Sequence, residues 1–414
     1  MSKKIILIIF VFILITGGIL GVYFFYLEDS ERSEFDEFRN LFPFGQSGDS
    51  DLLRDGDGFD REEVIDTDLS GLPVPELRQV SVNPVAGAIV YGEDEEIIRY
   101  IERGTGHIFE TRTNSLKTTR LSNTTIPKIQ KALWTPDGNT TVIQYIDEDN
   151  ERIETFAITL IENEDGEITL DGDFLPRNIT SLSVAPEENL LFYTVDGTEG
   201  SIGVTSDTKG ENRDQVLASP ITEWLSDWPE SDTVTLTTKP SALAAGLVLH
   251  INTRSEESEK ILGGILGLTV LTSPDTKKVI LSESSDGQIF LYTYNIKSQE
   301  RKTLPVQTLP EKCAWSKKEK EATFCAVPQV IPQGDYPDIW YQGLISFSDD
   351  IWKINSEDRI AELVAIPDQL AGVEIDTTSP ILSPSEEYII FTNKKDSTLW
   401  SLRLKESTES SEEN

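Results

Sequence analysis

The side chains that most often perform catalysis are scarce in this chain. Histidine occurs twice in 414 residues, at His107 and His250, and no Gly-x-Ser-x-Gly segment accompanies either. A hydrolytic triad needs a nucleophile, a His and an acid in contact, and a catalytic zinc needs three protein ligands. We therefore expect no catalytic residue, no metal ligand and no cofactor. The 72 Asp and Glu residues leave carboxylate chemistry, such as glycan cleavage, as the alternative that the composition allows.

Thiol chemistry is limited to two cysteines, Cys313 and Cys325. They flank one turn, and a hairpin centred on residues 318–320 sets them nearly opposite on neighbouring strands. Directly opposed strand residues have Cβ atoms about 4.5 to 5.5 Å apart, close to the separation that a disulfide needs. We expect a disulfide between them, with two buried free thiols as the alternative. Two thiols without a nearby His do not make a zinc site.

A short pattern that occurs seven times indicates the elements that carry these residues. Each copy has an apolar strand, a turn rich in Pro, Asp or Gly, and a second apolar strand, as in residues 132–145. The turns lie at Pro84, Pro136, Pro186, Pro229, Pro274, Lys317 and Pro384. They are roughly 40 to 70 residues apart, the period of a four-stranded propeller blade. The spacing predicts an all-β fold, a seven-bladed β-propeller over residues 73–404.

Each copy continues into two further strands, and the last of these predicts how the ring closes. We expect fourth strands at residues 116–121, 175–179, 259–262, 301–304 and 359–364. The seventh copy lacks one, because only an acidic tail follows Leu402. Residues 76–80 have the composition of a fourth strand and precede the first copy. We expect them to complete the last blade, which leaves no sheet edge exposed.

The recurring Trp/Leu-Ser/Thr-Pro-Asp-Gly element, clearest at Trp134-Thr135-Pro136-Asp137-Gly138, resembles the TolB-like (PD40-type) propeller repeat. The resemblance covers about four fifths of the chain, with Lys317 where the repeat has Pro. It implies a fold and no particular activity. The chain as a whole also looks like membrane-anchored propellers of bacteria.

One segment interrupts the repeat. Between the second and third strands expected for the sixth blade, about twenty residues are inserted, including Tyr336, Asp338, Trp340 and Tyr341. Long loops on a rigid scaffold are often functional, and Trp and Tyr contribute large contact areas with little loss of rotamer entropy. We predict these four residues as a binding site. The alternative is that Trp340 and Tyr341 pack the insertion onto its own blade.

The N-terminus predicts a membrane anchor. Residues 5–27 carry no charge, and 23 helical residues at about 1.5 Å each span about 34 Å, enough for a bilayer core of roughly 30 Å. Lys3 and Lys4 precede this run and acidic residues follow it, so the positive-inside rule keeps the N-terminus cytoplasmic. We expect a transmembrane signal anchor at residues 1–27 and a propeller outside the cytoplasm.

Two acidic segments flank the propeller. Residues 28–72 have little strand pattern and are predicted to be a flexible tether, and residues 405–414 a disordered tail. Residues 55–60 resemble part of a calcium loop. Aligning them with that loop puts Leu53 and Val64 at positions that need oxygen ligands, which argues against calcium.

The net charge of −36 excludes one class of partner, because nucleic-acid binding draws on clustered Lys and Arg. We expect a non-catalytic protein- or glycan-binding or assembly module, with the membrane and an envelope protein or glycan as partners. The alternative is a cell-surface carbohydrate-active enzyme, a hydrolase or lyase with carboxylates in the central channel. Such an enzyme should gather several Asp or Glu with an Arg or Tyr in one deep pocket, whereas a docking module should present a broad rim.

Overall fold

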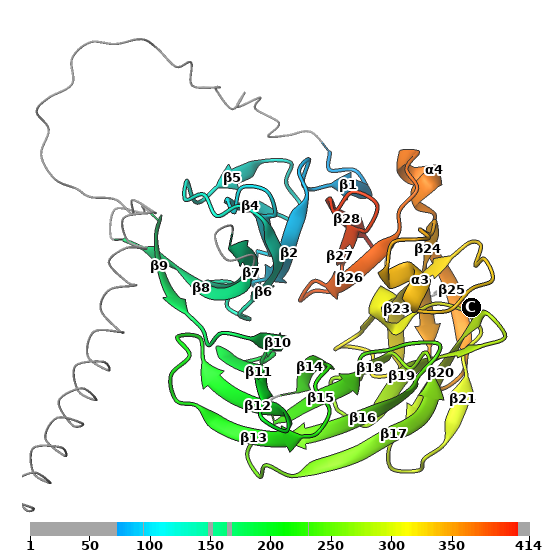
Figure 1. The fold of residues 1–414 in the computed structure, drawn as a ribbon. Helices are drawn as coiled ribbons and strands as arrows, with labels where there is room; N and C mark the ends of the chain where they lie inside the picture. The colour runs from blue at the N-terminus through cyan, green and yellow to red at the C-terminus, as the bar shows by residue number, and fades with distance from the viewer. Residues whose placement is uncertain (1–72, 94, 148–151, 164–167, 231, 405–414) are drawn as a thin grey trace, which may run out of the picture. The chain divides into compact units, whose positions relative to one another are not determined.

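The computed structural model describes residues 73–404, apart from 94, 148–151, 164–167 and 231. These residues form seven four-stranded antiparallel sheets that follow one another around a ring (Figure 1). The predicted seven-bladed β-propeller is confirmed. Among the described residues, no helix is long and apolar enough to cross a membrane. The predicted anchor at 1–27, the tether at 28–72 and the tail at 405–414 lie outside the described residues, so these assignments stay predictions.

The first four blades follow in chain order. Blade 1 contains β2 (Val85–Tyr91), β3 (Ile97–Glu102), β4 (Ile108–Arg112) and β5 (Thr118–Arg120). Blade 2 contains β6 (Ile129–Trp134), β7 (Thr140–Asp147), β8 (Arg152–Glu162) and β9 (Ile168–Phe174). Blade 3 contains β10 (Ile179–Val184), β11 (Leu190–Gly197), β12 (Gly200–Asp207) and β13 (Asp214–Ser219). Blade 4 contains β14 (Trp224–Glu230), β15 (Thr233–Thr238), β16 (Ala245–Asn252) and β17 (Ser258–Leu266).

Short helices accompany the last two of the remaining three blades. Blade 5 contains β18 (Val270–Thr272), β19 (Lys278–Ser285), β20 (Gln288–Asn295) and β21 (Arg301–Thr303). Blade 6 contains β22 (Cys313–Trp315), β23 (Ala322–Pro328), β24 (Asp349–Asn355) and β25 (Ile360–Ala365), with η1 (Pro310–Lys312) before β22 and α3 (Asp338–Tyr341) after β23. Blade 7 contains β26 (Thr377–Leu382), β27 (Tyr388–Asn393), β28 (Leu399–Arg403) and β1 (Leu77–Gln79), and α4 (Pro367–Ala371) precedes it.

The core lies between the blades. Consecutive residues of the second strand of a blade are buried, because alternate side chains point at the two neighbouring blades. In β19, Ile280 packs with Cys313 and Trp315 of blade 6, whereas Leu281 packs with Val248 of blade 4. This explains why the second strand of each repeat reads as a continuous apolar run rather than an alternating one.

The repeated turn residues have a hydrogen-bonding role. The Thr135 hydroxyl donates to the Asp137 carboxylate at 2.6 Å, which also accepts the N–H of Asn139 at 3.0 Å. Gly138 follows with a φ of 70°, a left-handed conformation that glycine adopts without strain. Ser273 and Asp275 form the same hydroxyl–carboxylate contact in blade 5 at 2.8 Å. The motif therefore specifies the turn between the first and second strands of a blade.

Three positions differ from the sequence prediction. Pro84 lies in the link between β1 and β2, so the first blade begins after this turn and not before it. Pro229 lies within β14, at a register shift between Asp227 and Glu230, and so precedes the turn in which it was expected. Residues 175–179 are mostly a link, because the fourth strand of blade 2 is β9, which ends at Phe174. Strand β9 was not predicted because it contains alternating Asp and Gly residues, and both types are uncommon in strands.

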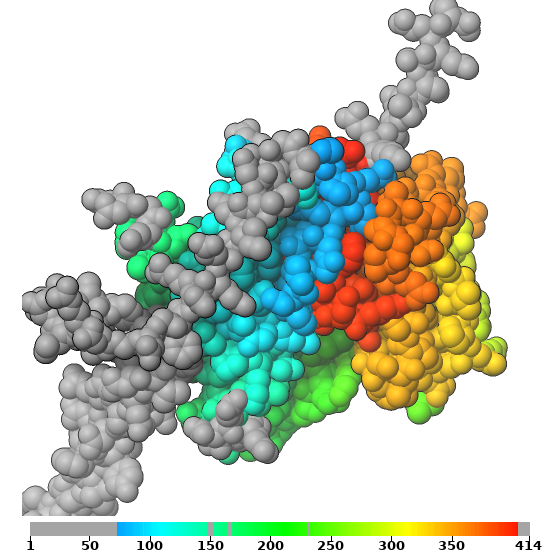
Figure 2. Space-filling model, turned by 90° about the horizontal axis from the view of Figure 1, so that it is seen from above, coloured from blue at the N-terminus to red at the C-terminus, as the bar shows by residue number. Residues whose placement is uncertain are grey.

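The ring closes as predicted from residues 76–80. Strand β1 pairs antiparallel with β28, with Leu77 opposite Leu402. Figure 2 shows the first described residues, in blue, against the red C-terminal strands. Leu77 is buried with Trp400 and Leu402, and the Arg78 guanidinium donates to the Arg112 carbonyl of blade 1 at 3.1 Å. The N-terminal strand therefore joins the last blade to the first.

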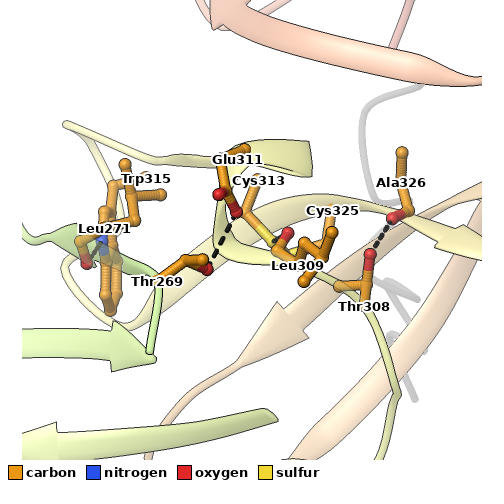
Figure 3. Close-up of a disulfide and its surroundings, with 9 residues drawn as sticks. All are labelled: Thr269, Leu271, Thr308, Leu309, Glu311, Cys313, Trp315, Cys325 and Ala326. Carbon is orange, nitrogen blue, oxygen red and sulfur yellow. Dashed lines mark hydrogen bonds between the residues drawn. A yellow bond between two sulfur atoms is a disulfide. The ribbon is translucent and has the colours of Figure 1, made fainter. Parts of the chain in front are cut away.

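The two cysteines lie directly opposite each other on β22 and β23. The structure joins them by a disulfide of 2.12 Å, with a Cα–Cα distance of 4.0 Å (Figure 3). Figure 3 also shows two hydrogen bonds around this bond, from Thr308 to the carbonyl of Ala326 and from Thr269 to Glu311. The first links the segment before η1 to β23, and the second links blades 5 and 6.

Candidate binding surface

The insertion in blade 6 extends beyond its own blade. It comprises residues 329–348, between β23 and β24. The Asp338 carboxylate accepts the N–H of Ala242, in the β15–β16 link of blade 4, at 2.7 Å. Gly334 donates its N–H to the carbonyl of Gly287, in the β19–β20 turn of blade 5, at 3.0 Å. The insertion therefore contacts two other blades at the end of the ring where second strands finish and third strands start.

A buried ionic cluster lies beneath the insertion. The Lys312 ammonium lies 2.7 Å from Asp349 and 2.6 Å from Asp376, and all three side chains are fully buried. Asp376 also accepts the indole N–H of Trp340 and the backbone N–H of Phe347, both at 3.1 Å. Burial raises the pKa of the Asp349 carboxyl above its ordinary value, although the Lys312 ammonium opposes the shift. These charges hold the insertion against blades 6 and 7.

Two of the four predicted binding residues are inaccessible. Tyr336 and Trp340 have exposed fractions of 1% and 2%, and both pack with Phe347 and Leu309. The Tyr336 hydroxyl donates to the carbonyl of Pro332 at 2.6 Å. The prediction that these two residues contact a partner is therefore wrong, because their surfaces are already covered. The packing alternative describes Trp340 correctly.

The other two predicted residues reach the surface. Asp338 is half-buried and bonds to Ala242, so it positions the insertion. Tyr341 is 38% exposed, and its hydroxyl donates to the Glu311 carboxylate, whose second oxygen accepts from Thr269 at 2.9 Å. Burial raises the pKa of Glu311 above its ordinary range, although these hydrogen bonds lower it. Tyr341 thus presents its ring while its hydroxyl is held in place.

Besides Tyr341, exposed leucines lie on the insertion and on the part of blade 4 that it contacts, and the sequence pattern did not reveal them. We define the insertion rim as Leu243, Leu266, Tyr341 and Leu344. Leu243 is 81% exposed and Leu344 is 69% exposed. Hydrogen bonds join the segments that carry these residues. Gly267, which follows Leu266, donates its N–H to the Ser241 carbonyl at 2.7 Å, and the Asp338 carboxylate of the insertion accepts the N–H of Ala242 at 2.7 Å. The signal in the sequence is a leucine inside a turn segment, Ser241-Ala242-Leu243-Ala244, where no strand pattern requires an apolar residue.

A pair of opposite charges lies on the first strands of blades 2 and 4. Lys131 on β6 and Asp227 on β14 reach water, yet protein surrounds both side chains. Desolvation lowers the pKa of Lys131 and raises that of Asp227, while each charge partly offsets the shift of the other. The Lys131 ammonium donates to the carbonyl of Leu182 at 3.3 Å. The pair supplies one carboxylate, whereas glycoside hydrolysis normally uses two.

The described part of the chain contains no candidate metal site. Among residues 73–404 without the gaps given above, no group of three or more His, Cys, Asp or Glu side chains is placed to hold a metal ion. His107 and His250 belong to blades 1 and 4.

Comparison with known proteins identifies the fold. No protein-family model matches the sequence, and neither does any curated protein. The oligogalacturonate lyase of Vibrio parahaemolyticus is similar in structure, with a TM-score of 0.52 at 12% identity over 80% of this chain and 94% of that chain. The GH74 xyloglucanase of Xanthomonas campestris has a TM-score of 0.52 at 10% identity over 79% of this chain and 53% of that chain. The chain shares their propeller fold.

TolB from Acinetobacter baumannii also matches, with a TM-score of 0.42 at 12% identity over 64% of this chain and 62% of that chain. The chain thus spans less than two thirds of the TolB structure. At such identities a structural likeness indicates the fold and not the activity. The predicted TolB-like propeller is confirmed at the level of the fold.

Proposed function

We propose that this propeller is a non-catalytic docking module that binds a partner protein at the insertion rim. The observation that carries the proposal is the exposure of Leu243, Tyr341 and Leu344 on loops that the structure fixes to a rigid ring. Adjacent exposed apolar side chains are typical of interaction sites. Because these loops are already ordered, binding loses little conformational entropy, which favours affinity.

The charge of the chain defines the partner further. With a net charge of −36, a partner that is basic around its contact site is attracted, and an acidic one is repelled. The partner in this proposal has an apolar hollow for Leu243 and Leu344, bordered by Lys or Arg. Such a surface suits a protein of the cell envelope better than a glycan, since Tyr341 is the one exposed ring of the insertion rim.

The weaker candidate is a carbohydrate-active enzyme. It is supported by Glu311, a carboxyl with a raised pKa beside the Tyr341 hydroxyl, and by the enzymes among the similar propellers. A raised pKa suits a general acid. In that case the wild type should cleave acidic or neutral oligosaccharides and Glu311→Gln should not. Absence of turnover by the wild type would contradict the enzyme candidate.

Site-specific photocrosslinking tests the docking proposal. A photoreactive residue replaces Leu344 in one variant of the full chain and Ile153, an exposed residue 55% accessible on blade 2, in the control. We expect a discrete crosslinked protein from native cells at position 344 and none at 153. Equal crosslinking at both positions, or none at 344, contradicts the proposal.

We further propose that residues 1–27 anchor the module so that the propeller lies outside the cytoplasm. The support is the uncharged run of residues 5–27 preceded by Lys3 and Lys4. A reporter enzyme that is active only outside the cytoplasm, fused after residue 414, should be active. A reporter that works only inside the cytoplasm should be silent, and activity of that reporter would reject the orientation.

A further inference from the structure

A polar pocket opens between blades 4 and 5, at the end of the ring opposite the insertion. Its volume is about 670 Å³, and eight residues line it: Thr233, His250, Asn252, Glu257, Ser258, Glu259, Thr276 and Ile296. Most of them lie where first strands end or third strands end, whereas the insertion follows a second strand. The pocket is therefore separate from the insertion rim.

The acceptors of this pocket are not neutralised by the protein. Glu257 and Glu259 are exposed, and neither forms an ion pair with another described residue. Two nearby cations have other partners, whereas Lys260 and Lys297, which follow lining residues in the chain, form no ion pair with a described residue. Arg254 pairs with Asp232 at 2.7 Å, and Lys277 pairs with Asp275 at 3.3 Å. Two carboxylates thus face one cavity, and the lining contains neither Lys nor Arg.

His250 adds a second, independent feature. Its side chain is nine-tenths buried and lies opposite Glu259 on the neighbouring strand. One ring nitrogen lies 3.5 Å from the Thr272 hydroxyl, at the limit of a hydrogen bond, and its other nitrogen has no partner among the residues that the structure describes. Burial lowers the pKa of His250 to about 4, so the ring is neutral at pH 7 and has one donor and one acceptor nitrogen.

The chemistry of the lining selects the ligand class. Two carboxylates without a cation disfavour an anion. A bare divalent metal ion does not fit, because the described residues hold no suitable group of three ligands. Apart from His250 the lining lacks the aromatic rings on which sugars commonly stack, and Ile296 offers a small apolar area. A ligand with two ammonium groups joined by methylenes matches all of these features.

We propose that the pocket between blades 4 and 5 binds a small organic diamine, with its ammonium groups on Glu257 and Glu259 and its methylenes against Ile296. Neutral His250 contributes a further acceptor in the tautomer whose proton lies on the nitrogen beside Thr272, whereas the Asn252 side-chain oxygen already accepts the N–H groups of Arg254 and Ser255. This site is independent of the docking function, because it lies at the other end of the strands.

Calorimetric titration of the purified full chain in detergent with putrescine tests the proposal. We expect saturable binding of one putrescine per chain. The double variant Glu257→Gln/Glu259→Gln removes both carboxylates at exposed positions and should weaken binding by about tenfold or more. The matched control Glu187→Gln/Glu188→Gln makes the same change in net charge at exposed residues of the β10–β11 turn and should bind like the wild type.

Three results overturn the proposal. The first is the absence of saturable binding. The second is an equal loss in both double variants, which indicates general attraction to an acidic protein. The third is displacement of putrescine by an equal concentration of Mg²⁺, which indicates a site for any divalent cation.

Discussion

Charged side chains are buried and paired at one end of the propeller, and exposed and unpaired at the other. On the insertion side, Lys312 pairs with Asp349 and Asp376, all three side chains are fully buried, and the leucines of the insertion rim are exposed. On the pocket side, Glu257 and Glu259 are exposed without a cation, and the apolar residue Ile296 lies within the wall. Buried paired charges fix a position, and exposed unpaired charges attract a ligand. Charge therefore stabilises the structure at the insertion end, and at the pocket end it stays accessible to a ligand.

The largest effect is expected from Lys312→Met, which tests whether the buried cluster is structural. Removing the ammonium leaves two carboxylates buried without a counter-ion, and such a change typically costs about 3 to 5 kcal/mol. The free energy of unfolding of the full chain, measured by urea titration, should fall by that amount at pH 7.

The matched control is Lys353→Met, which removes an ion pair of 2.8 Å with the exposed Glu319. Exposed pairs contribute about 0 to 1 kcal/mol, so this variant should unfold almost like the wild type. Equal losses in the two variants would show that the cluster under the insertion has no special structural role.

The next effect concerns the disulfide beneath the insertion. Replacing both Cys313 and Cys325 by Ala should lower the free energy of unfolding by about 3 kcal/mol, because the bond closes a loop with a sequence separation of 12 and restricts the unfolded chain. The mass of the intact wild type should also increase by two hydrogens on reduction. An unchanged mass would show that the thiols are free.

A smaller and pH-dependent effect is expected on the pocket side. Burial lowers the pKa of His250 from 6.5 to about 4. Between these values the unfolded chain binds a proton that the folded chain does not, so the folded state loses stability as the pH falls from about 6.5 to 4. The loss is at most about 3 kcal/mol and is absent above pH 7.

His250→Gln should reduce this acid-dependent loss, as measured by unfolding at pH 7.5 and pH 4.5. The control His107→Gln changes a less buried ring and should keep most of the loss. If His250→Gln keeps the full pH dependence, the ring is not the buried neutral group described here.

The propeller was predictable because its turns repeat a local chemistry. Thr135 and Asp137 bond to each other and to the backbone within five residues, so the sequence displays the whole interaction. The closing strand was predictable for a related reason, since a ring of blades leaves one place for residues 76–80. Strand β9 escaped prediction because Asp171, Gly172 and Asp173 are poor strand formers, and tertiary pairing with β8 decides their conformation.

The candidate site was only partly predictable. The insertion was visible as a break in the repeat, but the sequence does not show which aromatic side chains turn inward. Trp340 is buried because Asp376, 36 residues later, accepts its indole N–H. Nothing in the sequence indicated that Lys312 is buried, because one lysine in a chain with 26% charged residues resembles any other. The leucines of the insertion rim depend on contacts between blades 4 and 6, which are distant in sequence.

The most direct test of the docking account compares two pairs of exposed apolar residues. Leu243→Asp/Leu344→Asp alters the insertion rim, and Ile153→Asp/Ile161→Asp makes the same chemical change at exposed positions of blade 2. Purified full-length variants of equal stability are immobilised, and the partner identified by crosslinking at position 344 is titrated over them. We expect the first variant to lose about 2 kcal/mol or more of binding free energy, the range of interface hot spots, and the second to bind like the wild type. Equal affinity of the first variant and the wild type would contradict the account.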